Sequence, residues 1–310
     1  MNMDLRQLRY FVGIVEYGSV SRAAEALHVA QPALSQHLKK LEDDLGCQLM
    51  LRTPRGVVPT ESGRRLAQQA AVILQQVSAL RDEVRGLEAA PAGPASVGIP
   101  TSLGPLLTVP LALAVRRLYP AVHLRVVEGL SGHMLDWLHS GMVDVALVFG
   151  AEGVPGLASE FIAEEYLQLA APPGDPLAAR GAAGVDLAEV LPLPLILPSR
   201  PHGVREEVEQ AALVARQSPN VILEIDSLEH IKALVAEGVG YTIVSKRVAS
   251  SGPVGATLVQ VPIVNPRIER RISLAHASTR PLSVAAQAVR SLMAARLDEL
   301  ITAGYWREQG

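Results

Sequence analysis

The sequence holds a single cysteine, Cys47, among 310 residues, and it contains no long uninterrupted apolar run. One thiol cannot form an internal disulfide, which is typical of a reducing cytoplasm, and we expect Cys47 to be a small buried apolar residue. A membrane-spanning helix needs about 18–20 consecutive apolar residues. The N-terminus, with Asp4 and Arg6, lacks the apolar core of a signal peptide. These features predict a folded, cytoplasmic chain without a membrane partner.

A strong excess of positive charge is also missing. The net charge is −3, and residues 1–60 carry seven Lys and Arg against six Asp and Glu. Since nonspecific binding to nucleic acid depends on phosphate neutralisation, this balance predicts weak nonspecific binding with a shallow salt dependence.

Catalytic and metal-binding motifs are absent from the sequence. We find no Gly-x-Ser-x-Gly elbow and no Walker-type loop. The glycine-containing run 237–241 leads from a predicted helix to a strand, the reverse of a dinucleotide site. The eight histidines lack metal-ligand spacing. We therefore expect no enzyme, no catalytic residue, no cofactor and no metal.

Residues 19–55 contain two predicted helices separated by a tight turn at Val29 and Ala30. The first ends at His28 and is capped by Ser19 or Ser21; small Ala23 and Ala24 allow close packing. Proline at position 32 is well tolerated in the first turn of the second helix. An apolar stripe on this second helix consists of Leu34, Leu38, Leu41 and Leu45.

A separate polar face of the second helix suits nucleic acid. It consists of Pro32, Ser35, Gln36 and Lys39. Ser and Gln hydrogen-bond base edges or phosphates, and Lys neutralises phosphate. The loop that follows, 52–59, suits a wing in which Arg52 and Arg55 contact phosphates or the minor groove. A preceding helix that packs under these two is predicted from the helical spacing of Leu5, Leu8, Phe11, Val12 and Val15. We expect Phe11 to lie in the core of this domain.

The run GSVSRAAEALHVAQPALSQHLKKLEDDLGCQLMLRTPRGVVPTESG, residues 18–63, resembles the winged helix-turn-helix of LysR-type transcriptional regulators almost position for position. Within that family it resembles the nitrogen-assimilation-control members. The resemblance implies that Gln31, Pro32, Ser35 and Gln36 read bases and that Arg52 is the wing arginine. Many members carry Arg where this chain has Gln36; Gln favours adenine, whereas Arg favours guanine.

A long helix beginning near Thr60 carries apolar residues with an unbroken heptad spacing over three heptads. These residues are Leu66, Ala70, Ile73, Val77, Leu80, Val84 and Leu87. The strict 3.5-residue period favours a coiled coil with a second chain. A dimer would present two recognition helices to a pseudo-palindromic operator.

The second half of the chain alternates strands and helices in two βαβαβ sets, which predicts parallel pairing. The strands and helices are expected at 97–99, 103–118, 123–127, 134–140, 143–149, 166–171, 195–197, 204–215, 221–225, 228–237, 241–244, 271–275 and 284–301. This layout resembles the periplasmic-binding-protein-like effector domain of the same family.

The predicted fold class is therefore α/β, with an N-terminal winged helix-turn-helix, a long linker helix and a two-lobed effector domain. The domains are 1–60 for DNA binding, 61–88 for the linker helix, 89–95 for a hinge and 96–310 for the effector domain, with lobe I at about 96–164 and 268–305 and lobe II at about 165–267.

Three strands end in hydroxyl-rich turns before helices, where ligands gather in open α/β sheets. Free N–H groups and hydroxyls there suit a carboxylate; alternatively, the serines are only N-caps. His202 beside Arg200 is expected to supply cationic, pH-sensitive character, and Arg205 to form a surface or interlobe ion pair. The predicted effector residues are Thr101, Ser102, Phe149, Ser199, His202 and Ser227.

We thus predict a LysR-type transcriptional regulator. Its expected partners are double-stranded operator DNA, a small anionic effector between the lobes, further copies of the chain in a homodimer or homotetramer, and RNA polymerase. Two alternatives stay open at this point: a solute-binding module whose N-terminal segment recruits a protein, and an architectural DNA-binding protein without an effector.

Overall fold

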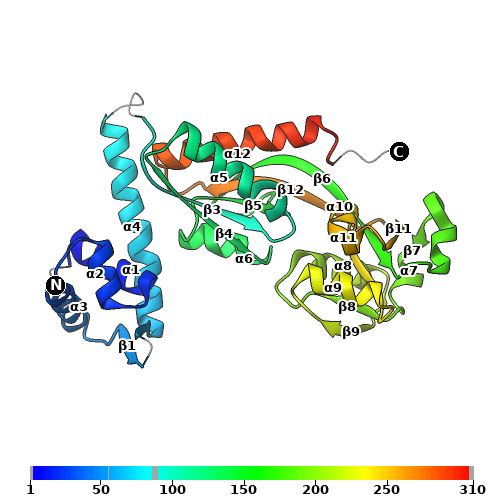
Figure 1. Cartoon of the computed structure of the whole chain (residues 1–310), viewed down its shortest axis with the longest axis horizontal. Helices are drawn as coiled ribbons and strands as arrows, with labels where there is room; N and C mark the ends of the chain where they lie inside the picture. The colour runs from blue at the N-terminus through cyan, green and yellow to red at the C-terminus, as the bar shows by residue number, and fades with distance from the viewer. Residues whose placement is uncertain (1–2, 55, 86–89, 307–310) are drawn as a thin grey trace.

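The computed structural model describes residues 3–54, 56–85 and 90–306. Figure 1 shows an N-terminal helical domain, a long helix beside it and two α/β lobes that follow. In the described part of the chain, no helix is both long and apolar enough to cross a membrane.

The N-terminal domain is a three-helix unit with a β-hairpin. Its elements are α1 (Leu5–Tyr17), α2 (Val20–Ala26), α3 (Gln31–Leu45), β1 (Met50–Thr53) and β2 (Gly56–Pro59). Phe11 lies in the core as predicted, together with Leu34 and Leu41 of the apolar stripe. Ser19, not Ser21, caps α2 through its hydroxyl, which accepts from the Arg22 N–H.

Two details of this domain differ from the sequence prediction. Helix α2 ends at Ala26 rather than His28, and His28 has a positive φ of 53° in the turn. Cys47 is exposed, not buried. It follows the left-handed C-cap Gly46, and Leu49 and Met50 are the residues of this segment that enter the core.

The hairpin is fastened to the helices by hydrogen bonds that the sequence did not reveal. A carboxylate oxygen of Glu42 accepts from the N–H groups of Leu49 (2.8 Å) and Met50 (3.2 Å). At the other strand, the Val57 N–H donates to the carbonyl oxygen of Gly18. A Cβ at Gly56 would overlap that same carbonyl, so only glycine fits there. The wing is thereby held at a fixed place relative to α1 and α3.

Helix α4 (Glu61–Arg85) confirms the predicted long helix. The Thr60 hydroxyl accepts from the Gly63 N–H at its start. Its first turns pack on α1 and on the N-terminal core through Leu66 and Ala67.

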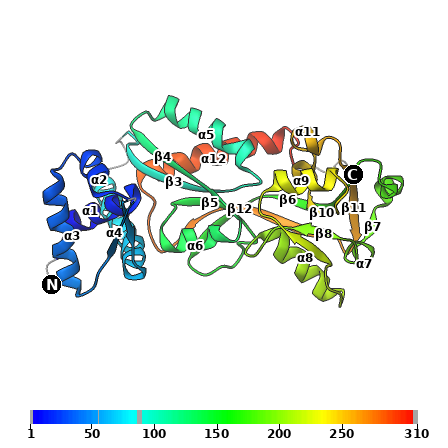
Figure 2. The ribbon, with the colours of Figure 1, turned by 60° about the horizontal axis from the view of Figure 1, so that its bottom comes forward.

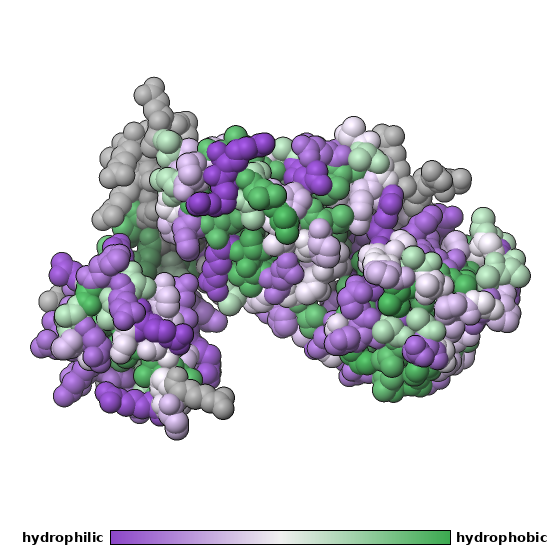
Figure 3. Space-filling view, viewed as in Figure 1, coloured by the Kyte–Doolittle hydropathy of each residue, from purple (hydrophilic) through white to green (hydrophobic). Residues whose placement is uncertain are grey.

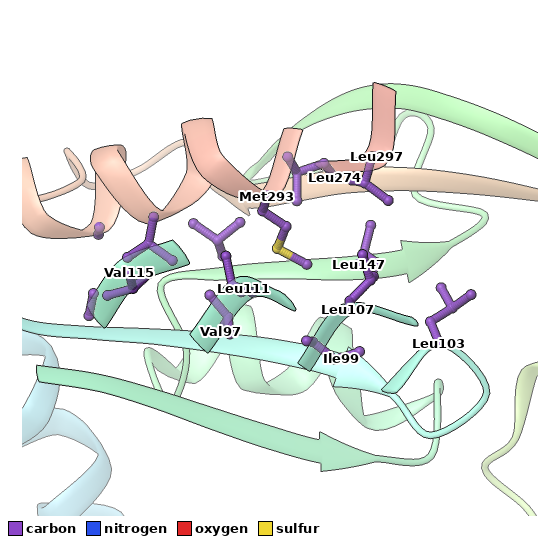
Figure 4. Packing of buried hydrophobic residues seen from close by; sticks show 14 of the residues in the cluster. Val97, Ile99, Leu103, Leu107, Leu111, Val115, Leu147, Leu274, Met293 and Leu297 are labelled. Atoms are coloured by element: carbon purple, nitrogen blue, oxygen red, sulfur yellow. The ribbon is translucent and has the colours of Figure 1, made fainter. Parts of the chain in front are cut away.

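Lobe I is a sheet with helices on both faces. Its elements are β3 (Gly93–Pro100), α5 (Gly104–Leu118), β4 (Val122–Gly129), α6 (His133–Ser140), β5 (Val145–Phe149), β12 (Glu269–Ala277) and α12 (Val284–Thr302). Strands β4, β3 and β5 are parallel, as predicted. Helices α5 and α12 cover one face and α6 the other (Figure 2). Figure 4 shows side chains of α5, α12 and the sheet interdigitating in the larger core.

Lobe II repeats this layering in a smaller form. Its helices and strands are η1 (Pro176–Ala183), β7 (Val185–Asp186), α7 (Leu187–Val190), β8 (Leu195–Leu197), α8 (Gly203–Val214), β9 (Val221–Glu224), α9 (Leu228–Ala236), β10 (Thr242–Ser245), α10 (Lys246–Ser250), α11 (Gly252–Gly255) and β11 (Val259–Asn265). Strands β8 and β9 are parallel, as predicted. Two apolar clusters lie on either side of this lobe's strands.

Strand β6 (Leu157–Ala171) runs through both lobes. Its first part pairs antiparallel with β12 in lobe I, and its last residues pair antiparallel with β10 and β11 in lobe II. The sequence predicted only 166–171 as a strand. It also placed 166–171 and 241–244 in one set of parallel strands, which was wrong, because β6 and β10 are antiparallel. Strand β3 also begins earlier than expected, because residues 93–95 of the predicted hinge already belong to the sheet; residue 89 lies outside the described residues.

Replacing Glu42 with Ala should destabilise the N-terminal domain. Leu49 and Met50 are buried, so their amides would lose an acceptor without gaining water, at about 1–3 kcal/mol. Amide hydrogen exchange of α3 and β1 in the full chain measures this. Glu42→Gln, which keeps one acceptor oxygen, should retain most of the protection, and exposed Asp44→Ala should retain all of it. Equal protection in Glu42→Ala and wild type would contradict the prediction.

Candidate DNA-binding surface and interlobe site

Helix α3 presents one polar surface to solvent. Gln31, Pro32, Gln36 and Lys39 are exposed, and Ser35 is half-buried beside them. Within the described ranges, the side chains of Gln31, Gln36 and Lys39 form no hydrogen bond or ion pair with another residue. Buried Ala23 and Ala24 of α2 let the two helices approach closely behind this surface. The geometry is that of a helix-turn-helix whose second helix is free to enter a groove.

The N-terminus of α3 carries no side-chain cap, a feature that sequence reasoning missed. Its N-cap position is Ala30, and Pro32 has no N–H, whereas α1 and α2 are capped by Asp4 and Ser19. An uncapped helix start exposes N–H groups and the positive end of the helix dipole, which suits a phosphate. Alanine at a cap position, where Ser, Thr, Asp or Asn is usual, was the available signal.

The wing arginine lies next to α3 in the chain and on the exposed side of the hairpin. Arg52 is exposed and pairs in register with Val57 across β1 and β2. Arg55 lies outside the described residues.

The predicted dimer seam on α4 divides into two parts. Leu66 is half-buried against the chain's own N-terminal core, and Ala70 is fully buried within the chain. Further along, Ile73 is 37% exposed, Leu80 is 58% exposed and Val77 is half-buried. The side chain of Val84, and Leu87 as a whole, lie outside the described residues. The unburied part of the seam is therefore the part available to a second helix.

A buried hydrogen bond joins the two lobes. The Gly203 N–H, at the start of α8 in lobe II, donates to the Ser131 hydroxyl oxygen of lobe I over 2.8 Å. Next to it, a Cβ at Gly132 would lie 2.7 Å from the Pro201 Cβ, so the two backbones meet without a gap. The lobes are thus in direct contact at the first turn of α8.

An unpredicted charge lies behind this contact. Arg270 of β12 is 2% exposed and forms an ion pair with Glu165 of β6. Its guanidinium carbon lies 4.0 Å from the centroid of the Phe149 ring. A Cβ at Gly203 would lie 3.9 Å from an Arg270 nitrogen. Phe149, which was predicted to contact the effector, therefore covers the buried Arg270 guanidinium instead of forming an open apolar wall.

His202 is neutral, which corrects the expectation of a cationic group. It is 3% exposed, and its Nδ1 accepts from the Val204 N–H, so His202 is the N-cap of α8. Burial, followed by the nearby positive charge of Arg270, lowers the pKa of His202 to about 4. The imidazole therefore does not titrate near neutral pH, and it is no anion-binding charge.

The predicted hydroxyl groups have three different roles. Ser199 is not a helix cap; its N–H and hydroxyl donate to Asp226, which lowers the pKa of that carboxyl. Ser227 is the N-cap of α9, the alternative role considered above. Ser102 does not cap α5, because Leu103 occupies that N-cap position without a side-chain bond. Thr101 lies in the same turn, its N–H bonded to Gly129.

Four of the predicted effector residues lie in two separate groups. Phe149 and His202 meet around Arg270, and the Ser199 turn lies against the turn that carries Ser227. The two arginines near them are engaged within lobe II: Arg200 pairs with Glu209, and Arg205 pairs with Glu209 and Glu224. No cluster of three or more potential metal ligands occurs among the described residues.

A second interlobe contact lies at the end of α12. Arg247 of α10, in lobe II, donates to the carbonyl oxygens of Tyr305 (2.9 Å) and Gly304 (3.1 Å) and lies over the Tyr305 ring. Tyr305 itself packs against the lobe I core. This contact joins the lobes in addition to the Ser131–Gly203 hydrogen bond and the two chain crossings, through β6 and from β11 to β12.

Comparison with known proteins matches both halves of the chain. Residues 5–64 match the family described as "Bacterial regulatory helix-turn-helix protein, lysR family", and residues 88–298 match "LysR substrate binding domain". The nitrogen assimilation regulatory protein Nac of Klebsiella aerogenes is 35% identical over 292 residues, 94% of each chain. Full-length OxyR of Pseudomonas aeruginosa matches with a TM-score of 0.74 at 25% identity, covering 96% of this chain and 95% of that one. CbnR solved with its target DNA matches with a TM-score of 0.60 at 24% identity, covering 95% and 100%.

The neutral state of His202 predicts a pH dependence of stability. The folded pKa of about 4 lies below the ordinary value of 6.5, so the unfolded chain binds the extra proton between these values. Stability is therefore lost as pH falls from 6.5 toward 4, by about 3 kcal/mol for this group. Urea unfolding of wild type and His202→Asn, which keeps a capping oxygen, should show this additional loss only in wild type. Parallel curves for the two proteins would contradict it.

Proposed function

The chain belongs to the LysR family of transcriptional regulators, and on that premise we propose that it reads a pseudo-palindromic operator as a dimer of dimers under the control of a small anionic effector. It is a regulator and not an enzyme. RNA polymerase is the proposed partner at the promoter. Because the target is chromosomal DNA, we propose a cytoplasmic location.

The exposed polar surface of α3 is the observation that carries this proposal. Gln31, Ser35, Gln36 and Lys39 share this surface, the helix start is uncapped, and Arg52 is exposed on the wing. Side-chain amides and hydroxyls read base edges in the major groove, while cations and free N–H groups hold phosphates. We assign Gln31, Pro32, Ser35 and Gln36 to base reading and Lys39, Arg52 and Arg55 to phosphates.

The first turn of α8 is the proposed contact for an effector. Its Gly203 N–H is a donor that an anion could bind, and in the structure the Ser131 hydroxyl oxygen accepts from it. An anionic ligand on Gly203 and the Ser131 hydrogen bond exclude one another, so a ligand would bind the separated lobes more tightly than the joined ones. Such differential affinity is what a ligand needs to shift a conformational equilibrium.

Two separate apolar surfaces support a dimer of dimers. One is the exposed part of the α4 seam, Ile73 and Leu80. The other is on the lobes: Leu113 of α5 is 66% exposed and Leu213 of α8 is 71% exposed. Figure 3 shows apolar patches on one face, over α5 and at the lower part of lobe II. Since the α4 seam and the lobe patches are separate surfaces, each can bind a different copy of the chain. The α4 seam would join two chains into a dimer, and the lobe patches would join two such dimers.

Charge and strand edges support opposite-direction pairing of the lobes. Arg116 is exposed and lies one helical turn after Leu113 on α5. Glu206 is exposed and lies two turns before Leu213, on the same side of α8. The edge strand β4 contacts α5, and the edge strand β9 is linked to α8 by the Arg205–Glu224 ion pair. Two antiparallel chains would bring α5 of each against α8 of the other, so that basic and acidic residues meet twice.

Gln36 variants test the reading face. Gln36→Ala should weaken binding to duplex selected from a random pool by about 1–3 kcal/mol if one base contact is lost. Gln36→Arg should change the preferred base at one position of each half-site from adenine to guanine. Fluorescence anisotropy and repeated selection measure the two effects. Gln69→Ala, an exposed amide on α4, serves as the matched control and should change neither.

Unchanged affinity and an unchanged selected sequence for both Gln36 variants would overturn the assigned reading face.

Leu113→Glu and Leu213→Glu test the lobe patches. Each should halve the mass of the assembly in light scattering and weaken its association at least tenfold, about 1.4 kcal/mol, because a charge would be buried against an apolar partner. Val239→Glu places the same charge at an exposed site of lobe II outside the patches and should keep the full mass. A full-size assembly of both leucine variants would refute this interface.

A further inference from the structure

Helix α6 touches a different part of the molecule at each end. It has eight residues, about 12 Å of helix. Ser131 and Gly132, just before it, contact lobe II, and Gly141, just after it, contacts the linker helix α4. In Figures 1 and 2 it lies between α4 on one side and lobe II on the other.

The contact at the N-terminal end is close and polar. Ser131 is 8% exposed and accepts from Gly203, and Gly132 leaves no room for a side chain beside Pro201. Movement of α8 away from lobe I must therefore break a buried hydrogen bond or carry the start of α6 with it.

The contact at the C-terminal end is equally close and involves one apolar and one charged side chain. Gly141 has a φ of +75°, and a Cβ there would overlap both the Val72 side chain of α4 and the Arg280 guanidinium. Arg280 donates to the carbonyl oxygens of Leu138 (2.8 Å) and Val143 (3.2 Å), so it fixes the last turn of α6 against the strand that follows. Glycine at this position lets the linker helix rest directly on the end of α6.

Between its ends, α6 is packed into the smaller core of lobe I. Met134 and Leu138 are fully buried in the smaller core of lobe I, together with Val143 and Val148. A short helix with packed side chains moves as one body, because a close-packed interior transmits displacement instead of absorbing it.

We propose that α6 is the mechanical link between the interlobe contact and the DNA-binding arm: making or breaking the Ser131–Gly203 hydrogen bond shifts α6, and α6 shifts α4 through Gly141 and Val72. This inference rests on the proposed control of DNA binding by the lobes. It names the residues through which that control reaches α4.

An engineered disulfide tests the link without a known effector. A Cβ at Gly203 would lie 3.7 Å from the Ser131 Cβ, within the range of about 3.5–4.5 Å that a disulfide needs. Full-length Ser131→Cys/Gly203→Cys, with Cys47→Ser to remove the native thiol, can therefore be locked by oxidation and released by reduction. The duplex selected by the wild type is the DNA probe, and hydrogen exchange of α4 is the second readout.

Locking should change the affinity for this duplex about fivefold or more, and it should change hydrogen exchange of α4 around Val72. In the same double-cysteine chain carrying Val72→Ala, the disulfide should still form, but the change in affinity should fall below about twofold. Val239→Ala removes the same two methyl groups from an exposed site and should leave the full effect in place.

An equal effect of locking with and without Val72→Ala would overturn the role of α6. No effect of locking on DNA affinity in any chain would instead count against control by the lobes, and hydrogen exchange of α4 would then decide on α6 alone. A change in α4 exchange that Val72→Ala abolishes would support the link, and unchanged exchange would overturn it.

Discussion

The ion pair between Arg270 and Glu165 is the interaction on which the two-lobed half depends. The two residues are register partners on β12 and β6, at the place where β6 leaves one sheet for the other. Both are largely buried, and removing one partner of such a pair leaves a buried charge at about 3–5 kcal/mol. The pair therefore fixes the register of the strands that cross between the lobes. Its cation also reaches Phe149 and His202, so it sets the electrostatics of the interlobe site.

Local signals in the sequence predicted the elements that form by local rules. The apolar stripe of α3, the position of Phe11 and the parallel strands of both lobes follow from periodicity and connection length, and the structure confirms them. The first part of β6 was missed because residues 157–165 carry several charges and become a strand only through pairing with β12, more than 100 residues later. Non-local pairing leaves no periodic signal in the strand itself.

The contacts made by the predicted effector residues were not foreseen in detail, and the reasons are physical. Hydroxyls near helix starts suggested effector contacts or, alternatively, N-caps. The structure instead has His202 and Leu103 at the N-cap positions of α8 and α5, and the Ser199 hydroxyl donates to Asp226. A cap depends on backbone dihedrals at a single residue, which composition does not specify. Arg270 gave no signal, because an arginine in a strand is usually exposed and only its opposite neighbour Glu165 makes burial possible.

Counting charges understates how basic the exposed polar surface of α3 is. Two of the six acidic residues in the first 60 are engaged with the backbone of their own domain: Asp4 caps α1, and Glu42 holds the two amides at the start of β1. Lys39 and Arg52, in contrast, are exposed beside the uncapped start of α3. A near-neutral domain can thus present a positive surface, because two of its acidic side chains accept internal hydrogen bonds while Lys39 and Arg52 stay in solvent. The attraction of this surface for phosphate therefore depends less on net charge than on two other properties. These are the direction in which each ionised side chain points and the groups that it already binds.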